Sequence, residues 1–123
     1  MSRRAVLILS DDALAAALLG AAAELAGNAV HFPHPDEAAR AALLRTRPVL
    51  ALVDCAHDDA CCEAFVGPAI MTGAQVVLVR TPHAPRDPGA LASHPGVMVL
   101  DLPRDLARLH ALLETSPGVG RQP

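Results

Sequence analysis

Acidic residues close two of the apolar runs in this sequence, and they are the residues best suited to chemistry. The run at 5–9 leads directly into Ser-Asp-Asp at 10–12, and the run at 48–54 ends on Asp54. If the two runs are neighbouring parallel strands, their carboxyl ends meet at one edge of a sheet. Open α/β sheets bind ligands in the crevice at that edge, where the strand order reverses. The pattern therefore predicts an acidic site there.

Asp11, Asp12 and Asp54 are the candidate metal ligands of this site. Clustered carboxylates repel one another unless a cation neutralises them, and Mg²⁺ takes one or two carboxylates together with water and phosphate oxygens. An aspartate beside Mg²⁺ can also accept a phosphoryl group and form an aspartyl phosphate. Two plainer interpretations stay open, because Asp11 or Asp12 can cap the following helix and Asp54 can simply end its strand.

Apolar runs without alternation are typical of strands buried on both faces of a parallel sheet. Five such runs occur, at 5–9, 29–32, 48–54, 75–80 and 96–100. The spacing of leucine and alanine predicts helices at 12–26, from 34–37 to about 45, from 58–59 onward, and at 104–115. We expect Gly67-Pro68 to interrupt or break the third helix, because proline disrupts a helix interior.

Alternating strands and helices indicate a single α/β domain at residues 1–115. Parallel neighbours require crossover connections, which the helices supply. The predicted fold is a doubly wound, flavodoxin-like sheet of five parallel strands in the order 2-1-3-4-5, as the middle of three α/β/α layers. The segment 81–95 contains four prolines and Gly89, so we expect it to be the most mobile ordered part of the chain. The tail at 116–123 has no periodicity, and we expect it to be loose.

The composition excludes several classes of protein. The chain has 123 residues, of which 52% are hydrophobic and 19% charged, which suits one globular core. With two phenylalanines, no other aromatic residue and a net charge of −3, it lacks the basic surface and stacking rings of nucleic-acid-binding proteins. Three cysteines, two of them adjacent, indicate no disulfide framework, and the first apolar run is too short for a signal sequence or membrane span. We expect a cytoplasmic protein with no membrane association.

Three segments carry a resemblance to a known family. They are the first apolar run with its acidic cluster, the stretch PDEAARAALLRTRPVLALVD that ends on Asp54, and Leu102-Pro103-Arg104-Asp105 with the leucine-containing helix behind it. Over residues 4–115 the chain resembles the receiver domains of bacterial two-component response regulators. The resemblance implies that Asp54 is the phosphoacceptor, that Leu102–Pro103 is a cis peptide, and that Asp105 caps the last helix.

The chain departs from the family's pattern around the phosphoryl group. The family has a lysine where Leu102 stands, and all ten basic residues of this chain are arginine. The family's switch hydroxyl falls at Arg80, with Thr81 one residue later, and one of its two metal-side acids falls at Ser10. Arg80 and Thr81 are therefore candidate phosphate contacts. Arg80 can replace the lysine, since a guanidinium binds phosphate well, or it can be a surface charge at a strand end.

The resemblance implies an atypical receiver that acts by contact with a sensor kinase or another signalling protein. It would not be an enzyme beyond self-phosphorylation and dephosphorylation at Asp54. Weakly bound Mg²⁺ is the expected cofactor, with no organic one, because no glycine-rich loop follows the first strand. Homodimerisation is left open. One alternative is a flavodoxin-like domain that binds or transforms a small molecule in the same crevice, and another is an interaction module with an inert crevice.

Overall fold

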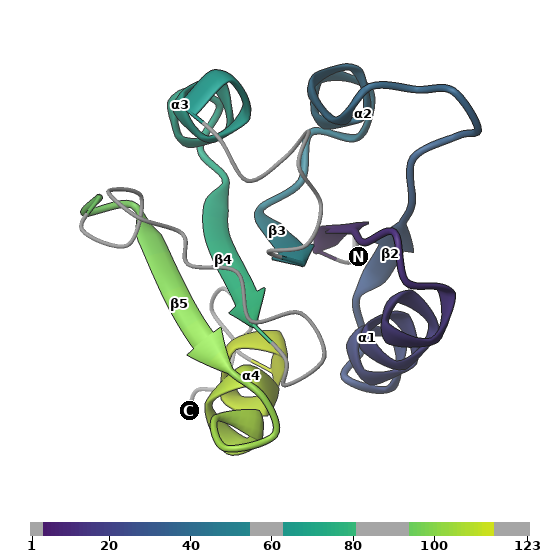
Figure 1. Cartoon of the computed structure of the whole chain (residues 1–123), viewed down its shortest axis with the longest axis vertical. Helices are drawn as coiled ribbons and strands as arrows, with labels where there is room; N and C mark the ends of the chain where they lie inside the picture. Colours follow the sequence, from purple (N-terminus) through teal and green to yellow (C-terminus); the bar gives the residue numbers. More distant parts are fainter. Residues whose placement is uncertain (1–3, 55–62, 81–93, 115–123) are drawn as a thin grey trace.

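The computed structural model describes residues 4–54, 63–80 and 94–114, and it contains the predicted parallel sheet (Figure 1). The strands are β1 (Ala5–Leu9), β2 (Ala29–His31), β3 (Leu50–Asp54), β4 (Gln75–Arg80) and β5 (Val97–Asp101). The helices in these ranges are α1 (Ala13–Leu25), α2 (Ala39–Thr46), α3 (Glu63–Met71) and α4 (Leu106–Glu114). All neighbouring strands are parallel, and their order β2-β1-β3-β4-β5 confirms the prediction.

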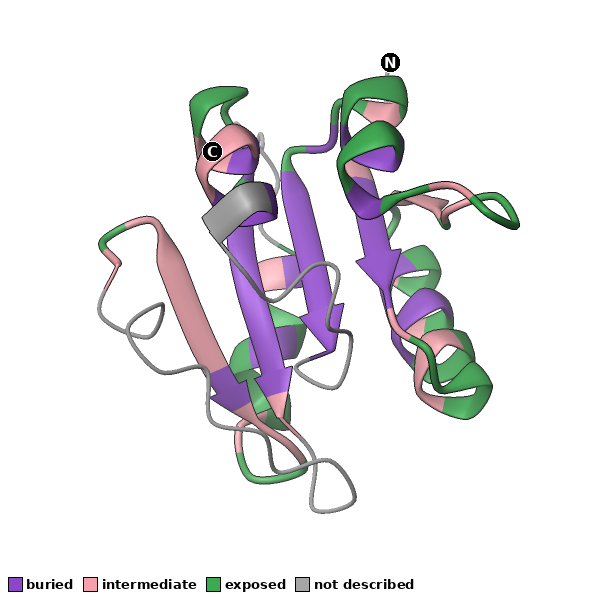
Figure 2. Cartoon of the chain, turned by 45° about the horizontal axis from the view of Figure 1, so that its top comes forward, coloured by how far each residue is buried: buried purple, intermediate pink, exposed green. Residues whose placement is uncertain are grey.

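Two helical layers cover the sheet. Helices α2 and α3 lie on one face, which we name the α2/α3 face, and α1 and α4 lie on the other, the α1/α4 face (Figure 1). Successive residues of a strand point to opposite faces, so Leu7 and Leu9 contact the core under α2 and α3, while Val6 and Ile8 contact the other core. β3 is buried along its whole length (Figure 2). Burial on both faces is the reason that the strand sequences do not alternate.

The second helix begins later than the sequence pattern predicts. α2 starts at Ala39, and the residues expected to open it form an irregular turn in which Asp36 has a left-handed φ of 65°. The Glu37 carboxylate holds this turn, because it accepts the His34 N–H at 2.8 Å and two guanidinium hydrogen bonds from Arg45, each at 2.8 Å. The prediction was wrong because this ion pair with a later residue of α2 stabilises a conformation that cannot be helical.

The third helix continues through Gly67 and Pro68, which corrects the expected interruption. Proline in a helix interior costs about 3 kcal/mol, because it removes one backbone hydrogen bond and crowds the preceding turn. Burial offsets this cost, since Phe65, Val66 and Ala69 of the same helix are fully packed into the core. The helix also closes normally, with the Thr72 N–H donating to the Pro68 carbonyl at 3.0 Å.

Two side chains fasten α4 to the amino-terminal half of the domain. The buried amide of Asn28 donates to the carbonyl of Ala23 in α1 at 3.1 Å and to that of Leu113 in α4 at 2.9 Å. Arg4 donates to the carbonyl of Leu112 at 3.4 Å, and burial lowers the pKa of its guanidinium. The last carbonyls of a helix have no partner within the helix, so these bonds fix the end of α4 against α1.

Some expectations fall outside the described residues. They are the mobility of 81–95, of which only 94 and 95 are described, the loose tail at 116–123, and the start of the third helix at 58–59. No helix in the described ranges is both long and apolar enough to cross a membrane.

Arg45 should control the ionisation of Glu37. Hydrogen bonds from Arg45 and from the His34 N–H lower the pKa of Glu37 from its ordinary value to about 2. A carboxyl whose pKa is lowered by folding contributes stability that is complete above its ordinary pKa of 4.5 and is lost as the pH falls toward 2. We expect Arg45→Gln to return the pKa of Glu37 most of the way to 4.5 in a carbon-detected NMR titration.

Arg40→Gln, on the exposed side of the same helix, is the matched control and should leave the titration of Glu37 unchanged. Denaturation midpoints of wild type and Arg45→Gln should differ near neutral pH and converge near pH 2. An unchanged Glu37 titration in Arg45→Gln would contradict the assigned ion pair.

Candidate functional site

Asp54 ends the central strand β3 and lies at the carboxyl edge of the sheet, as predicted. Its side chain is 4% exposed, and among the described residues it is the one charged side chain that is buried. Ser10 follows β1, the neighbouring strand, and its hydroxyl donates to Oδ2 of Asp54 at 2.9 Å. A buried carboxylate is costly unless it is hydrogen-bonded, so this contact is a main support of the site.

Asp12 caps α1, the helix that follows it in the chain. Its Oδ1 accepts the N–H groups of Leu14 at 2.9 Å and Ala15 at 3.3 Å, which makes it the N-cap of α1. Ser10 braces the same turn, because its Oγ accepts the N–H of Asp12 at 3.1 Å. Asp11 is exposed between them. Of the two interpretations of Asp12, helix cap and metal ligand, its geometry fits the helix cap, because its carboxylate is turned toward α1.

The candidate metal ligands are brought to one edge of the sheet but do not form a compact cluster. Within the described ranges, no group of three or more His, Cys, Asp or Glu side chains is arranged to hold a metal ion. Ser10 contributes a neutral hydroxyl next to Asp54, and one carboxylate oxygen of Asp12 is occupied by helix N–H groups. Mg²⁺ is commonly held by one or two carboxylates and completes its octahedral shell with water, so these residues would supply only part of that shell.

Arg80, at the end of β4, is paired with Asp101 at the end of β5. The guanidinium donates from Nε at 2.7 Å and from Nη2 at 3.0 Å, which is a bidentate contact. Strand alternation directs both side chains to the α2/α3 face, since Val79 and Leu100 point to the α1/α4 face. Asp54 follows Val53, which points to the α2/α3 face, so its side chain points to the opposite one. The geometry therefore gives Arg80 a structural partner and directs it away from Asp54.

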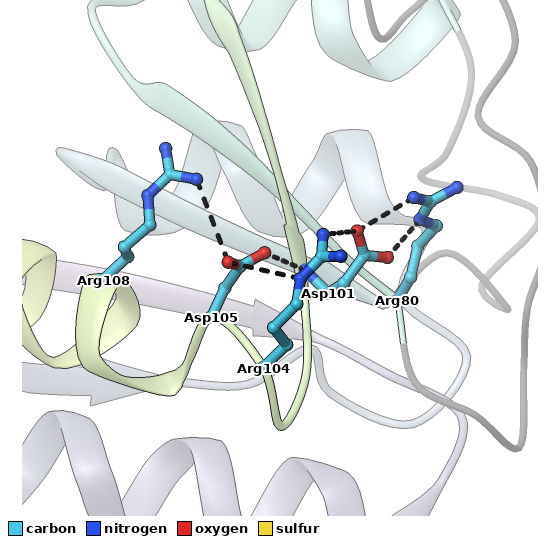
Figure 3. Close-up of polar contacts among 5 residues, drawn as sticks. All are labelled: Arg80, Asp101, Arg104, Asp105 and Arg108. Carbon is cyan, nitrogen blue, oxygen red and sulfur yellow. Dashed lines mark hydrogen bonds and ion pairs between the residues drawn. The ribbon is translucent and has the colours of Figure 1, made fainter.

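Asp101 is the centre of a chain of charges that the sequence analysis did not identify (Figure 3). Arg104 donates to its Oδ2 at 3.1 Å, and Arg104 and Arg108 lie 3.9 and 4.0 Å from Oδ1 of Asp105. The hydrogen bonds from Arg80 lower the pKa of the Asp101 carboxyl. Arg80 and Asp101 each close an apolar run, and they are in register on adjacent strands, so strand pairing was the signal that could have revealed them.

The Leu102 side chain contacts other apolar side chains. It packs against the core on the α1/α4 face, the face to which Asp54 points, and its N–H donates to the carbonyl of Arg80 at 2.8 Å. The Leu102–Pro103 peptide is cis, which confirms the prediction from the family's pattern. Asp105 directly precedes α4, but its carboxylate accepts the N–H of Asp101 at 2.8 Å rather than one from the helix. Thr81 lies outside the described residues.

Removing the guanidinium of Arg80 should change the titration of Asp101. We expect Arg80→Gln to raise the pKa of Asp101 toward its ordinary value of 3.8, because the largest cause of its lowering is lost. Carbon-detected NMR of the aspartate carboxyls measures this directly. Arg108→Gln is the control, since Arg108 contacts Asp105 and not Asp101. If Arg80→Gln left the pKa of Asp101 in place, the assigned pair would be refuted.

Comparison with known proteins bears on the fold. No protein-family model matches this chain, and no curated protein matches it. Among solved structures, the chain is similar to a protein described as a transiently phosphorylated "switch" in bacterial signal transduction. The two share 23% identity with a TM-score of 0.62, over 93% of this chain and 94% of that one. Together with the strand order, this likeness shows that the chain has the flavodoxin-like fold expected from its resemblance to receiver domains.

Proposed function

We propose that this chain is a receiver-like signalling domain that acts by protein–protein contact and responds weakly or not at all to phosphorylation of Asp54. The likeness in fold to a phosphorylated switch supports the signalling class. One observation supports the weak response to phosphorylation. The buried carboxylate of Asp54 accepts a hydrogen bond from Ser10, at a position where receivers have an acid.

The balance of charge supports weak switching. A phosphoryl group on Asp54 would add nearly two negative charges to an already acidic crevice. Leu102 supplies no charge on the Asp54 face, and Arg80 is engaged by Asp101 on the other face. A modification shifts a two-state equilibrium only as far as it is stabilised in one state more than in the other. Since neither Leu102 nor Arg80 aims a cation at the phosphoryl group, we expect that difference to be small.

We expect Mg²⁺ to bind weakly, with Asp11 and Asp54 as its carboxylate ligands. Asp12 has one carboxylate oxygen committed to the cap of α1, and Ser10 adds no charge. Bound at this edge, Mg²⁺ would neutralise part of the acidic charge of the crevice. The domain itself would catalyse nothing beyond the gain and loss of a phosphoryl group on Asp54. Its partners would be a sensor kinase or another signalling protein.

Restoring the missing charges should restore phosphoryl-analogue binding. We expect wild type to show less than about one-tenth occupancy of Asp54 when it is incubated with a small-molecule phosphodonor and Mg²⁺ and analysed by mass spectrometry. The double variant Ser10→Asp, Leu102→Lys should bind beryllium fluoride with Mg²⁺ at least about tenfold more tightly than wild type, because one ion pair at an enclosed site contributes a kcal/mol or more.

Two controls make this result specific. Adding Asp54→Asn to the double variant should abolish binding, and Leu106→Lys, which places an ammonium at an exposed position of α4, should leave wild-type binding unchanged. Circular dichroism confirms that each variant is folded. Stoichiometric modification of Asp54 in wild type would overturn the proposal of weak phosphorylation.

A further inference from the structure

The hydroxyl of Ser10 has two acceptors within reach of its one proton. Its Oγ lies 2.9 Å from Oδ2 of Asp54 and 3.3 Å from the backbone carbonyl oxygen of Asp12. The same Oγ accepts the N–H of Asp12 at 3.1 Å, and a hydroxyl oxygen has lone pairs for this bond whichever way its proton points. Rotation about the Cβ–Oγ bond is therefore enough to move the proton from one acceptor to the other while the oxygen stays in place.

The charge of Asp54 decides which acceptor receives the proton. A hydrogen bond to a carboxylate is roughly twice as strong as one to a neutral carbonyl, and Oδ2 of Asp54 is also the nearer acceptor. The burial of Asp54 adds to this preference, because a hydrogen bond is electrostatically stronger away from water. If Asp54 loses its charge, the preference weakens and the carbonyl of Asp12 becomes a competing acceptor.

Asp12 connects Ser10 to the first turn of α1. Its carboxylate accepts the N–H groups of Leu14 and Ala15, and its backbone carbonyl accepts the N–H of Ala16 at 2.9 Å. The N–H and the carbonyl of Asp12 are also the two backbone groups within reach of the Ser10 hydroxyl. One side chain therefore links the end of β3 to the start of α1.

We propose that Ser10 is a positioning residue that couples the charge of Asp54 to the first turn of α1. While Asp54 is charged, the Ser10 hydroxyl ties this turn to the end of β3. When Asp54 is neutralised, the hydroxyl turns to Asp12 and the turn loses this bond to the sheet. The coupling deepens the proposed function and rests on it for a role in signalling, because it names α1 as the part of the domain that responds to Asp54. A response confined to one turn is small, in agreement with the weak response to phosphorylation.

The directions of the side chains fit this route. Leu9 and Val53 point to the α2/α3 face, so Ser10 and Asp54, which follow them, point to the α1/α4 face, on which α1 packs. The first turn of α1 is at the surface, since the Leu14 side chain is 67% exposed. Loosening this turn therefore changes the exposed surface of the domain beside the acidic crevice.

A double-mutant cycle read by amide NMR tests the coupling. Asp54→Ala removes both the charge and the acceptor. In an otherwise wild-type chain, it should make the amide hydrogens of Leu14 and Ala15 exchange at least about twofold faster, because the first turn loses its bond to β3. It should also move the amide proton of Asp12 upfield, because an Oγ that no longer donates to a carboxylate is a weaker acceptor.

Variants of Ser10 separate the coupling from a direct effect of charge. In Ser10→Ala the first-turn amides should already exchange fast, and adding Asp54→Ala should change them little further. Ser10→Thr keeps a hydroxyl and should keep the full response to Asp54→Ala. Thr72→Ala is the matched control, since it removes another part-buried hydroxyl, one that donates to the carbonyl of Ala69 in α3 at 2.8 Å, and it should leave the response intact.

An equal response to Asp54→Ala with and without the Ser10 hydroxyl would overturn the coupling, because a direct effect of charge would then explain it. No response in wild type, or a response lost in Ser10→Thr, would overturn it as well. If circular dichroism shows that Asp54→Ala is unfolded, Asp54→Asn keeps the size of the side chain and should move the Asp12 amide proton in the same direction. The cycle uses no phosphodonor, so stoichiometric phosphorylation of wild type would contradict the proposed function and leave this result standing.

Discussion

A buried carboxylate at the end of the central strand is the constraint around which this domain is arranged. The Ser10 hydroxyl, one strand away, donates to Asp54 and offsets part of the cost of its burial. That contact requires β1 and β3 to be parallel neighbours in register, which in turn requires the helices on both faces. The same contact also limits what the carboxylate can do. Ser10 supplies a dipole where an acid would supply a charge, so the site is poorer in the negative charge that attracts a divalent cation.

A network of charged side chains lies at the outer edge of the sheet. Arg80, Asp101, Arg104, Asp105 and Arg108 pair with one another where β4, β5 and α4 meet (Figure 3). Arg80 and Asp101 point to the face opposite Asp54, and this network links the end of β5 to β4 and to the start of α4. Leu102 takes the inward position and joins the core. Under the proposed function, the hydrogen bond beside Asp54 and these ion pairs at the strand ends would replace the charged site and the movable strand end of a phosphorylation switch.

The pattern of apolar residues in the sequence predicted the structure correctly where burial determines it. The strands are mostly apolar, and the central ones are buried on both faces, so their positions, their parallel order and the meeting of Ser10 and Asp54 followed from the sequence. The sequence pattern gave wrong predictions where a side-chain contact between separate segments determines the course of the backbone. The ion pair between Glu37 and Arg45 delays α2, and core packing around Phe65 carries α3 through Pro68. Whether Asp12 caps a helix or binds a metal depends on a rotamer, which no pattern reveals. The direction of the Arg80 side chain, in contrast, follows from strand alternation and could have been predicted from the sequence.

Under the proposed function, events at Asp54 are not transmitted to β5 and α4, and an amide NMR titration of wild type with beryllium fluoride and Mg²⁺ measures this. Amide signals near Ser10 and Asp54 should shift slightly at most, while those of Arg80, Asp101 and the α4 residues should keep their positions. Saturable shifts that extend through β5 and α4 and vanish in Asp54→Asn would contradict it, and would show that the domain switches despite Leu102.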